Sequence, residues 1–167
     1  MDLDRSFNLS HLRSAVVLLL SLLVCFGAAR LGALATMPAI STWYAALEKP
    51  AFAPPNWVFP VVWTLLYFLM ALALWRVAVP AERDATAWGA LLAFGVQLVL
   101  NVLWSFAFFA GQNPAAGFGT ILLLLAAIVW TMVRFARVER AAAILLVPYL
   151  LWVSYAALLN AAIWRLN

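Results

Sequence analysis

Residues 87–111 read AWGALLAFGVQLVLNVLWSFAFFAG, an apolar run without a single charged side chain. As an α-helix, a run of this length crosses the ~30 Å hydrocarbon core of a bilayer. Four further stretches are similarly long and apolar, with one or two arginines each, at residues 14–37, 59–79, 115–138 and 141–166. Each is far longer than a barrel strand, and hydrocarbon leaves no partner for unpaired backbone groups. The sequence therefore predicts an all-α membrane protein, a single domain over residues 1–167 that forms a five-transmembrane-helix bundle.

The overall composition agrees with lipid as the solvent. The chain is 68% hydrophobic and 10% charged, whereas soluble domains are about 45–50% apolar and ~25% charged. Its net charge of +4 comes from basic residues scattered singly at the ends of apolar runs. This pattern is typical of membrane edges and predicts no nucleic-acid partner. Cys25 is the only cysteine, so neither an intramolecular disulfide nor a cysteine metal cluster can form, and no metal site is predicted.

The longest connection between the apolar runs covers residues 38–57 and contains four prolines. It cannot form one regular helix, because proline lacks a backbone N–H. Ser41 or Thr42 could cap a short helical turn through Leu47, which Lys49-Pro50 would end. Proline also restricts the unfolded chain, so this loop is predicted to act as a shaped lid, with a stiff linker as the alternative.

The basic residues also predict an orientation. Five spans place the two termini on opposite sides of the membrane. The side of the N-terminus carries Arg5, Arg13, Arg76, Arg83, Arg134, Arg137 and Arg140, and the other side carries Arg30, Lys49 and Arg165. We therefore expect an integral membrane protein of bacterial type. If the protein lies in the inner membrane, its N-terminus should be cytoplasmic, because basic residues concentrate on the cytoplasmic side.

Polar side chains in the third run follow one helical face. Gln97, Asn101, Trp104 and Phe108 recur at spacings of 4, 3 and 4. Amides are costly to expose to lipid, so this face should point into the bundle. Hydrogen bonds between helices and the wall of a pocket for a flat ligand are both consistent with this stripe.

The fifth and second runs carry matching stripes. Tyr149, Trp152, Ala156 and Asn160 share a face in the fifth run, where Pro148 is expected to kink the helix. Phe59, Trp63 and Tyr67 follow at i, i+4 spacing in the second run. Of the nine tryptophans, Trp63, Trp104 and Trp152 lie deepest and are the predicted pocket residues. Between residues 118 and 133, the only polar side chains of the fourth run are two threonines. This run is therefore expected to face mainly lipid.

Three groups of residues, in order along the chain, resemble the translocator protein / tryptophan-rich sensory protein family, also known as the peripheral-type benzodiazepine receptor family. The first is Trp43-Tyr44, Leu47, Lys49-Pro50, Pro54-Pro55, Trp57-Val58-Phe59, Trp63-Thr64 and Tyr67. The second is Gln97, Asn101, Trp104 and Phe108-Phe109, and the third is Val147-Pro148-Tyr149, Trp152, Asn160 and Arg165-Leu166-Asn167. The resemblance covers residues 43–167.

The resemblance implies a bundle that binds tetrapyrroles such as protoporphyrin IX and haem-related porphyrins beneath the first loop. Porphyrin or haem would then be the ligand, and no cofactor is required. At the matching positions, the implied ligand-binding residues are Tyr44, Pro54, Trp63, Tyr67, Gln97, Asn101, Trp104, Trp152, Ala156 and Asn160. Some bacterial members are reported to promote light- and oxygen-dependent porphyrin breakdown, which would assign Trp63 and Trp152 a catalytic role.

This chain departs from the family pattern at three places. Phe52 stands where the family often has tryptophan, which alters the lid. Ala161 follows Asn160 where the cholesterol-recognition pattern needs an aromatic residue, so sterol is not an expected partner. Leu92 and Val96 replace small residues linked to dimer formation, so a homodimer is left open.

Four functions follow from these observations. The leading hypothesis is a membrane receptor or sensor that binds porphyrins and regulates or transports them. The second is a light-dependent porphyrin-degrading protein, the third a small passive transporter and the fourth a structural membrane partner. No nucleophile–base pair, Walker loop or charge at mid-depth occurs in the spans, which favours a binding protein over an enzyme or an ion-coupled pump.

Overall fold

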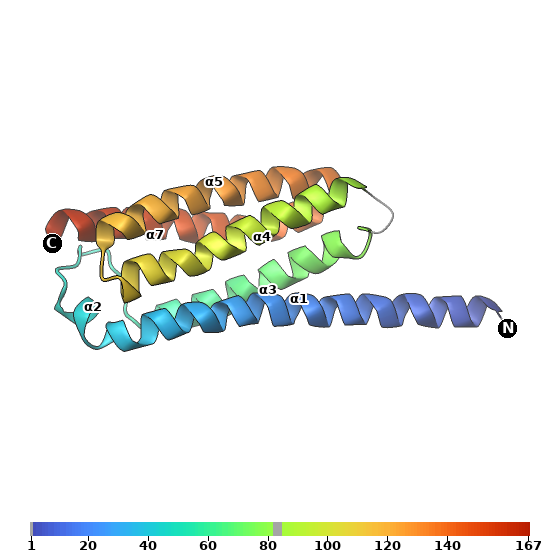
Figure 1. The fold of residues 1–167 in the computed structure, drawn as a ribbon, viewed down its shortest axis with the longest axis horizontal. Coiled ribbons are helices and arrows are strands. Elements are labelled where there is room, and N and C mark those ends of the chain that lie inside the picture. Colours follow the sequence, from blue (N-terminus) through green and yellow to red (C-terminus); the bar gives the residue numbers. More distant parts are fainter. Residues whose placement is uncertain (1, 82–84) are drawn as a thin grey trace.

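The computed structural model describes residues 2–81 and 85–167, and describes the side chains of residues 10–81 and 86–167. The side chains of Arg5 and Arg83, which entered the predicted orientation, lie outside the described residues. The helices are α1 (Asp2–Ile40), α2 (Trp43–Ala46), α3 (Val58–Ala78), α4 (Ala85–Ser105), α5 (Pro114–Val138), α6 (Arg140–Leu145) and α7 (Val147–Leu166). A π-helix, η1 (Phe106–Ala110), continues α4 (Figure 1).

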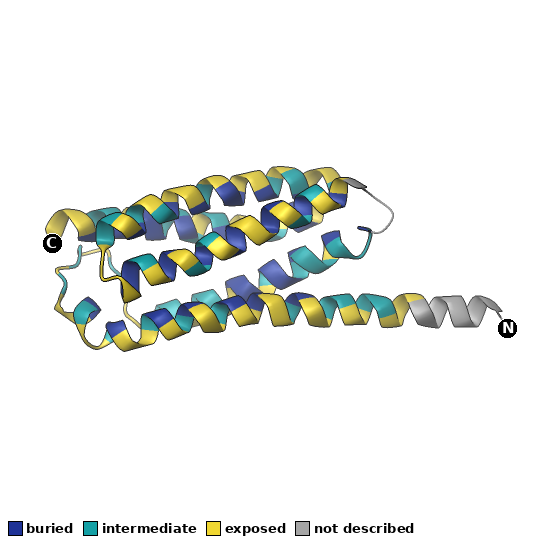
Figure 2. Ribbon diagram, viewed as in Figure 1, coloured by how far each residue is buried: buried dark blue, intermediate teal, exposed yellow. Residues whose placement is uncertain are grey.

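Five helical segments of the described chain are long and apolar enough to cross a membrane. They are Ser10–Ile40, Val58–Ala78, Thr86–Ala110, Pro114–Val138 and Arg140–Leu166. The predicted all-α architecture with five spans is therefore confirmed. Exposed positions along every span carry large apolar side chains, such as Leu23, Leu123 and Leu158 (Figure 2). An apolar exterior of this kind is stable only in contact with lipid.

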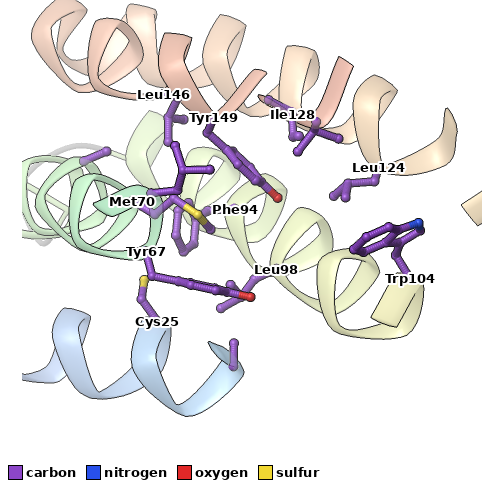
Figure 3. Packing of buried hydrophobic residues seen from close by; sticks show 14 of the residues in the cluster. Cys25, Tyr67, Met70, Phe94, Leu98, Trp104, Leu124, Ile128, Leu146 and Tyr149 are labelled. Carbon is purple, nitrogen blue, oxygen red and sulfur yellow. The ribbon is translucent and has the colours of Figure 1, made fainter. Parts of the chain in front are cut away.

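The helices pack in a fixed order. α1 lies beside α3, and α4 lies beside α5 and also touches α1, while α5 packs against α7 (Figure 1). Between them, Met70, Phe94, Leu124, Ile128 and Tyr149 form the centre of the buried core (Figure 3). α3 packs against α6 near the end of the bundle that holds the N-terminus and touches α7 far less. The opposite end, beneath the 41–57 loop, is where a cavity forms.

α5 begins with a sequence-encoded cap. The Asn113 side chain accepts a hydrogen bond from the Ala116 backbone N–H at 3.0 Å, and Pro114 occupies the first helical turn. Proline is favoured there because its missing N–H has no partner inside the helix. Gln112 precedes the cap with a φ of 49°, which is rare for a residue other than glycine. This turn brings the start of α5 back against the end of α4.

The predicted kink in the fifth span is a break between α6 and α7 at Leu146. Pro148 has no N–H to donate to the carbonyl of Ile144. Instead, the Leu146 N–H bonds the Ala143 carbonyl, and regular helix resumes where the Leu150 N–H bonds the Leu146 carbonyl. The break directs α6 toward α3 and α7 toward α5.

α5 exposes most of its surface, as expected for a fourth span that mainly faces lipid, and buries a single face. This face is buried along the whole helix, through Gly117, Ile121, Leu124, Ile128 and Phe135. These residues recur at helical spacing, but they are apolar like the lipid-facing ones. With only two threonines between residues 118 and 133, this span gave little sign of which face packs against protein.

The 41–57 loop is tied to α7 at two points. The Tyr155 hydroxyl donates to the Phe52 carbonyl at 2.8 Å, and the Asn167 amide makes two hydrogen bonds with the Glu48 backbone. The Phe52 ring, at the position where the family often has tryptophan, lies edge-on to Tyr155. Helix α1 continues through Pro38 to Ile40, two residues beyond the predicted start of the loop. The loop is a shaped element fastened across one end of the bundle.

Candidate ligand-binding cavity

A cavity of about 590 Å³ lies under the 41–57 loop, between α1, α3 and α4. Its size is within the range of about 300–1,000 Å³ typical of small-molecule sites. The lining is predominantly apolar and aromatic, with a few polar groups. Those polar groups are Thr36, Tyr44, Asn56, Thr64, Tyr67, Asn101 and Ser105.

Trp63 of α3 is the centre of an aromatic cluster at the inner wall. Its ring lies 5.6 Å from that of Tyr67 and 6.3 Å from that of Tyr149, measured between centroids. It is stacked on Trp104 of α4 at 6.4 Å, with an angle of 29° between the two planes. Two nearly parallel indoles on facing helices present flat surfaces to the cavity. Such surfaces suit a planar aromatic ligand.

A chain of hydrogen bonds runs inward from the cavity wall. The Tyr67 hydroxyl donates to Asn101 Oδ1 at 2.6 Å, and Asn101 Nδ2 donates to the Tyr149 hydroxyl at 2.8 Å. The Tyr149 hydroxyl donates in turn to Gln97 Oε1 at 3.0 Å. All four side chains are buried, so the chain fixes α3, α4 and α7 relative to one another. Gln97 Nε2 ends it without a partner among the described residues.

Asn160 of α7 fixes the second indole. Trp104 Nε1 donates to Asn160 Oδ1 at 3.2 Å, and Asn160 Nδ2 donates to the Pro114 carbonyl at 2.7 Å. Asn160 therefore positions Trp104 and also supplies a hydrogen-bond donor to a carbonyl at the start of α5. Gly117 leaves the room for this arrangement, because a Cβ there would lie 2.9 Å from Asn160 Oδ1 and 2.8 Å from the Phe108 ring.

The π-helix changes which phenylalanine faces the cavity. In η1 the Gly111 N–H bonds the Phe106 carbonyl, five residues back, which rotates the helix by about one residue. Phe109 consequently lines the cavity. Phe108, the last member of the predicted stripe, is buried instead between Trp43 of α2, at 5.5 Å, and Trp104, at 5.8 Å. The predicted inward orientation holds for all four stripe residues, but only Asn101 and Trp104 reach the cavity.

The structure divides the ten sequence-predicted site residues into two groups. The cavity is lined by Tyr44, Trp63, Tyr67, Asn101 and Trp104. The other five, Pro54, Gln97, Trp152, Ala156 and Asn160, lie outside it. Of these, Gln97 and Asn160 act through the hydrogen bonds described above.

Trp152, one of the three predicted pocket tryptophans, lies behind the wall of the cavity. It packs edge-on against Phe59, at 5.9 Å, and tilted against Tyr155, at 5.5 Å. Its Nε1 is buried and finds no hydrogen-bond partner in the described part of the chain. Phe59 itself lines the cavity, so one ring separates Trp152 from the space.

The face of α1 is the part of the site that the sequence analysis missed. Seven residues of this helix line the cavity, namely Phe26, Ala29, Gly32, Ala33, Thr36, Met37 and Ile40. They recur at spacings of three and four, which is one helical face. Most are small or apolar, and such residues on one face are common in any membrane span. Only Thr36 offered a polar signal.

The cavity opens toward the side of α1 and α3. Several lining residues are exposed, including Met37 of α1, Trp57 of the loop and Thr64 of α3. These residues surround the opening, whereas the lining residues of α4 are largely buried. In a bilayer, helix faces in this position contact lipid, so the cavity is within reach of molecules dissolved in the membrane.

The loop supplies the roof of the cavity. Tyr44 of α2 packs against Phe109 at 5.6 Å, and the Lys49 ammonium lies over the Tyr44 ring, 4.8 Å from its centroid. Burial, with a smaller contribution from nearby Tyr155, raises the pKa of the Tyr44 phenol above its ordinary value. The phenol therefore stays neutral at physiological pH and is able to donate a hydrogen bond.

Comparison with known proteins assigns the family. Residues 19–165 match the TspO/MBR family. The chain belongs to this family. It is 41% identical to the tryptophan-rich protein TspO of Chlorobaculum tepidum, an alignment that covers 93% of this chain and 98% of that protein. It is 42% identical to the tryptophan-rich protein TspO of Archaeoglobus fulgidus, over 81% and 87% of the two chains.

The similarity extends to animals. The human translocator protein is 35% identical over 128 residues, which are 75% of each chain. The family resemblance inferred from the sequence motifs is therefore confirmed. The chain is a TspO/MBR family membrane protein with a buried aromatic cluster.

Proposed function

We propose that this TspO/MBR family protein is a membrane receptor for porphyrins, which binds protoporphyrin IX or a haem-related tetrapyrrole in the cavity beneath the loop. The observation that carries the proposal is the pair of stacked indoles, Trp63 and Trp104, in the wall of a largely apolar cavity. A porphyrin is flat and aromatic, so it gains contact area against such rings at little conformational cost.

The polar groups of the cavity suit the remaining parts of a porphyrin. Asn101 and Tyr67 lie at the inner wall and can meet pyrrole nitrogens, while Tyr44 and Asn56 belong to the loop, where carboxylates would approach water. The lining contains neither histidine nor cysteine. The site therefore suits metal-free porphyrin, or haem held without those two axial ligands.

The name of one relative is consistent with transport. The human relative is called a translocator protein. In this chain, a cavity open on the α1 and α3 side would collect a porphyrin dissolved in lipid. Regulation of a membrane partner and passage of the porphyrin both start from that binding step.

A titration in the dark tests the proposal. Protoporphyrin IX added to the purified chain in detergent should quench tryptophan fluorescence in a saturable way, because Trp63 and Trp104 lie within the site. A cavity-filling variant, Ala33→Phe, should lose this quenching while it keeps the melting temperature of the wild type. Quenching that is linear in porphyrin concentration, or equal in both proteins, would contradict a site in this cavity.

Illumination and vesicles separate the alternative functions. If bound porphyrin keeps its absorption band under light and oxygen, the protein is not a degrading enzyme. If the band bleaches faster than with Ala33→Phe, catalysis accompanies binding. Porphyrin flux into sealed vesicles that contain the protein would identify a transporter.

The orientation of the chain in the membrane gives a separate prediction. Cysteines introduced by Lys49→Cys and Arg137→Cys, each in a Cys25→Ser background, lie at opposite ends of the bundle. We expect an impermeant maleimide to modify the Lys49→Cys protein in intact cells and the Arg137→Cys protein only after permeabilisation, because the basic end should be cytoplasmic. The reverse pattern would place the N-terminus outside.

A further inference from the structure

The contact between α4 and α5 holds an arginine in an unusual place. A Cβ on Gly89 of α4 would lie only 1.9 Å from Arg134 Nη2 and 3.0 Å from Cζ of the same side chain. The guanidinium of Arg134 therefore packs on the α4 backbone, in space that a side chain at residue 89 would occupy. Arg134 forms no hydrogen bond or ion pair with any described side chain or backbone group. Among the described residues, this cation therefore has no partner at the surface where the two helices meet.

Arg134 belongs to a basic edge with aromatic neighbours. Trp130, Arg134 and Arg137 lie on one face of α5, at i, i+4 and i+7. Trp130 is exposed, and on α4 the indole of Trp88, next to Gly89, is 65% exposed. Indoles in such positions are typical of the boundary between hydrocarbon and headgroups. The guanidinium therefore lies at the depth where lipid headgroups begin.

The nearest described carboxylate is occupied elsewhere. Glu139 accepts two hydrogen bonds from Arg76 Nε, both at 2.8 Å, and forms an ion pair with that residue of α3. It compensates Arg76 and leaves Arg134, Arg137 and Arg140 without an acidic partner among residues 10–81 and 86–167. Among the described residues, positive charge therefore exceeds negative charge at this corner, and an anion from outside the chain can balance it.

The surroundings favour a lipid over a soluble anion. Exposed apolar residues lie close by on both helices, Leu92 one turn along α4 from Gly89 and Val133 next to Arg134 on α5. A molecule with its anionic group on Arg134 would lay its hydrocarbon chains along these residues. Basic pockets between membrane helices are a known form of anionic-lipid site.

We propose that Arg134, where it packs on Gly89, binds the phosphate of an anionic phospholipid, with Trp88 and Trp130 beside the headgroup and the acyl chains along α4 and α5. The site lies on the surface formed by α4 and α5, away from the porphyrin cavity between α1, α3 and α4 (Figure 1). It does not depend on the proposed porphyrin function. Its role would be to select the lipid that fastens α4 to α5.

Native mass spectrometry of the detergent-purified full chain tests this site. Phosphatidylglycerol and phosphatidylcholine with identical acyl chains are titrated separately, and the fraction of lipid-bound protein is measured. We expect phosphatidylglycerol to bind more tightly than phosphatidylcholine. Arg134→Gln should weaken phosphatidylglycerol binding about fivefold, the loss expected for one arginine near a lipid headgroup.

Two matched variants distinguish the effect of the Gly89–Arg134 contact from the effect of net charge. Gly89→Ala keeps every charge and favours the helix, but its methyl group displaces the guanidinium. It should weaken phosphatidylglycerol binding about two- to fivefold, because one headgroup contact is lost. Arg165→Gln removes the same charge at the opposite end of the bundle and should leave binding unchanged. Melting temperatures confirm that each variant is folded.

Three results would overturn the proposal. Equal binding of the two lipids by the wild type would exclude selection for an anionic headgroup. Equal weakening by Arg134→Gln and Arg165→Gln would show that net charge alone determines binding. Complete competition by inorganic phosphate would identify an anion site that does not recognise lipid.

Discussion

Replacement of Trp63 by alanine should weaken protoporphyrin binding about 30-fold or more. Trp63 has ring contacts with Tyr67, Trp104 and Tyr149, and it lines the cavity. Aromatic residues at the centre of a binding site typically contribute ~2 kcal/mol or more when truncated, which is about 30-fold in affinity. The loss of the indole removes one of the two flat walls and leaves Trp104 without its stacking partner. The dissociation constant is measured by fluorescence titration in the dark.

Two control variants locate the ligand within the bundle. Trp63→Phe keeps an aromatic ring in the wall and should retain most of the affinity. Trp152→Phe alters a side chain that Phe59 separates from the cavity, so it should leave affinity nearly unchanged. If Trp152→Phe weakens binding as much as Trp63→Ala, while both variants melt like the wild type, the porphyrin instead occupies the space around Trp152.

The spans were predictable because hydrophobic length is a direct physical requirement of the bilayer. Each predicted run coincides with an observed helical segment to within a few residues, apart from the first, whose helix extends toward the N-terminus. The kink before α7 was also predictable, because Pro148 cannot donate the backbone hydrogen bond that a continuous helix needs. These features depend on one residue or one segment at a time.

The direction of side chains was predictable only where polarity marks the inner face. Gln97 and Asn101 are buried as expected, because an amide in lipid would lose its hydrogen bonds. α5 and the cavity face of α1 had few such markers, so their buried sides could not be distinguished from their lipid-facing sides.

Local helix geometry set a second limit. The π-helix at 106–110 places Phe109 rather than Phe108 in the cavity. Spacing rules assume a regular α-helix, and nothing in the sequence from Phe106 to Ala110 indicates that a π-helix forms there. Similarly, the stripe on α7 was correctly placed on one helix, but its members face the core behind Phe59 and Trp104 rather than open space. Whether an inward side chain points into the packed core or into the cavity depends on the neighbouring helices.

Replacement of Asn101 by leucine should lower the melting temperature of the bundle by roughly 5–15 °C. Asn101 accepts from Tyr67 and donates to Tyr149, so its loss leaves two phenol groups without that partner. An unpaired buried polar group costs about 1–3 kcal/mol, and for a chain of this size each kcal/mol shifts the melting temperature by about 2–4 °C. Unfolding in detergent is followed by circular dichroism.

A second variant tests whether the loss of hydrogen bonds, rather than the changed size of the side chain, lowers the melting temperature. In the triple variant Asn101→Leu, Tyr149→Phe, Gln97→Leu, the stranded polar groups of α4 and α7 are removed together, and Tyr67 can turn its hydroxyl to the cavity. Removing both partners of a buried hydrogen bond costs little, so the triple variant should melt higher than Asn101→Leu alone. Thr120→Val serves as a control, because that exposed hydroxyl bonds only its own helix, and it should change the melting temperature little. If the triple variant is less stable than the single one, the hydrogen-bond chain contributes through its shape rather than through its polar pairing.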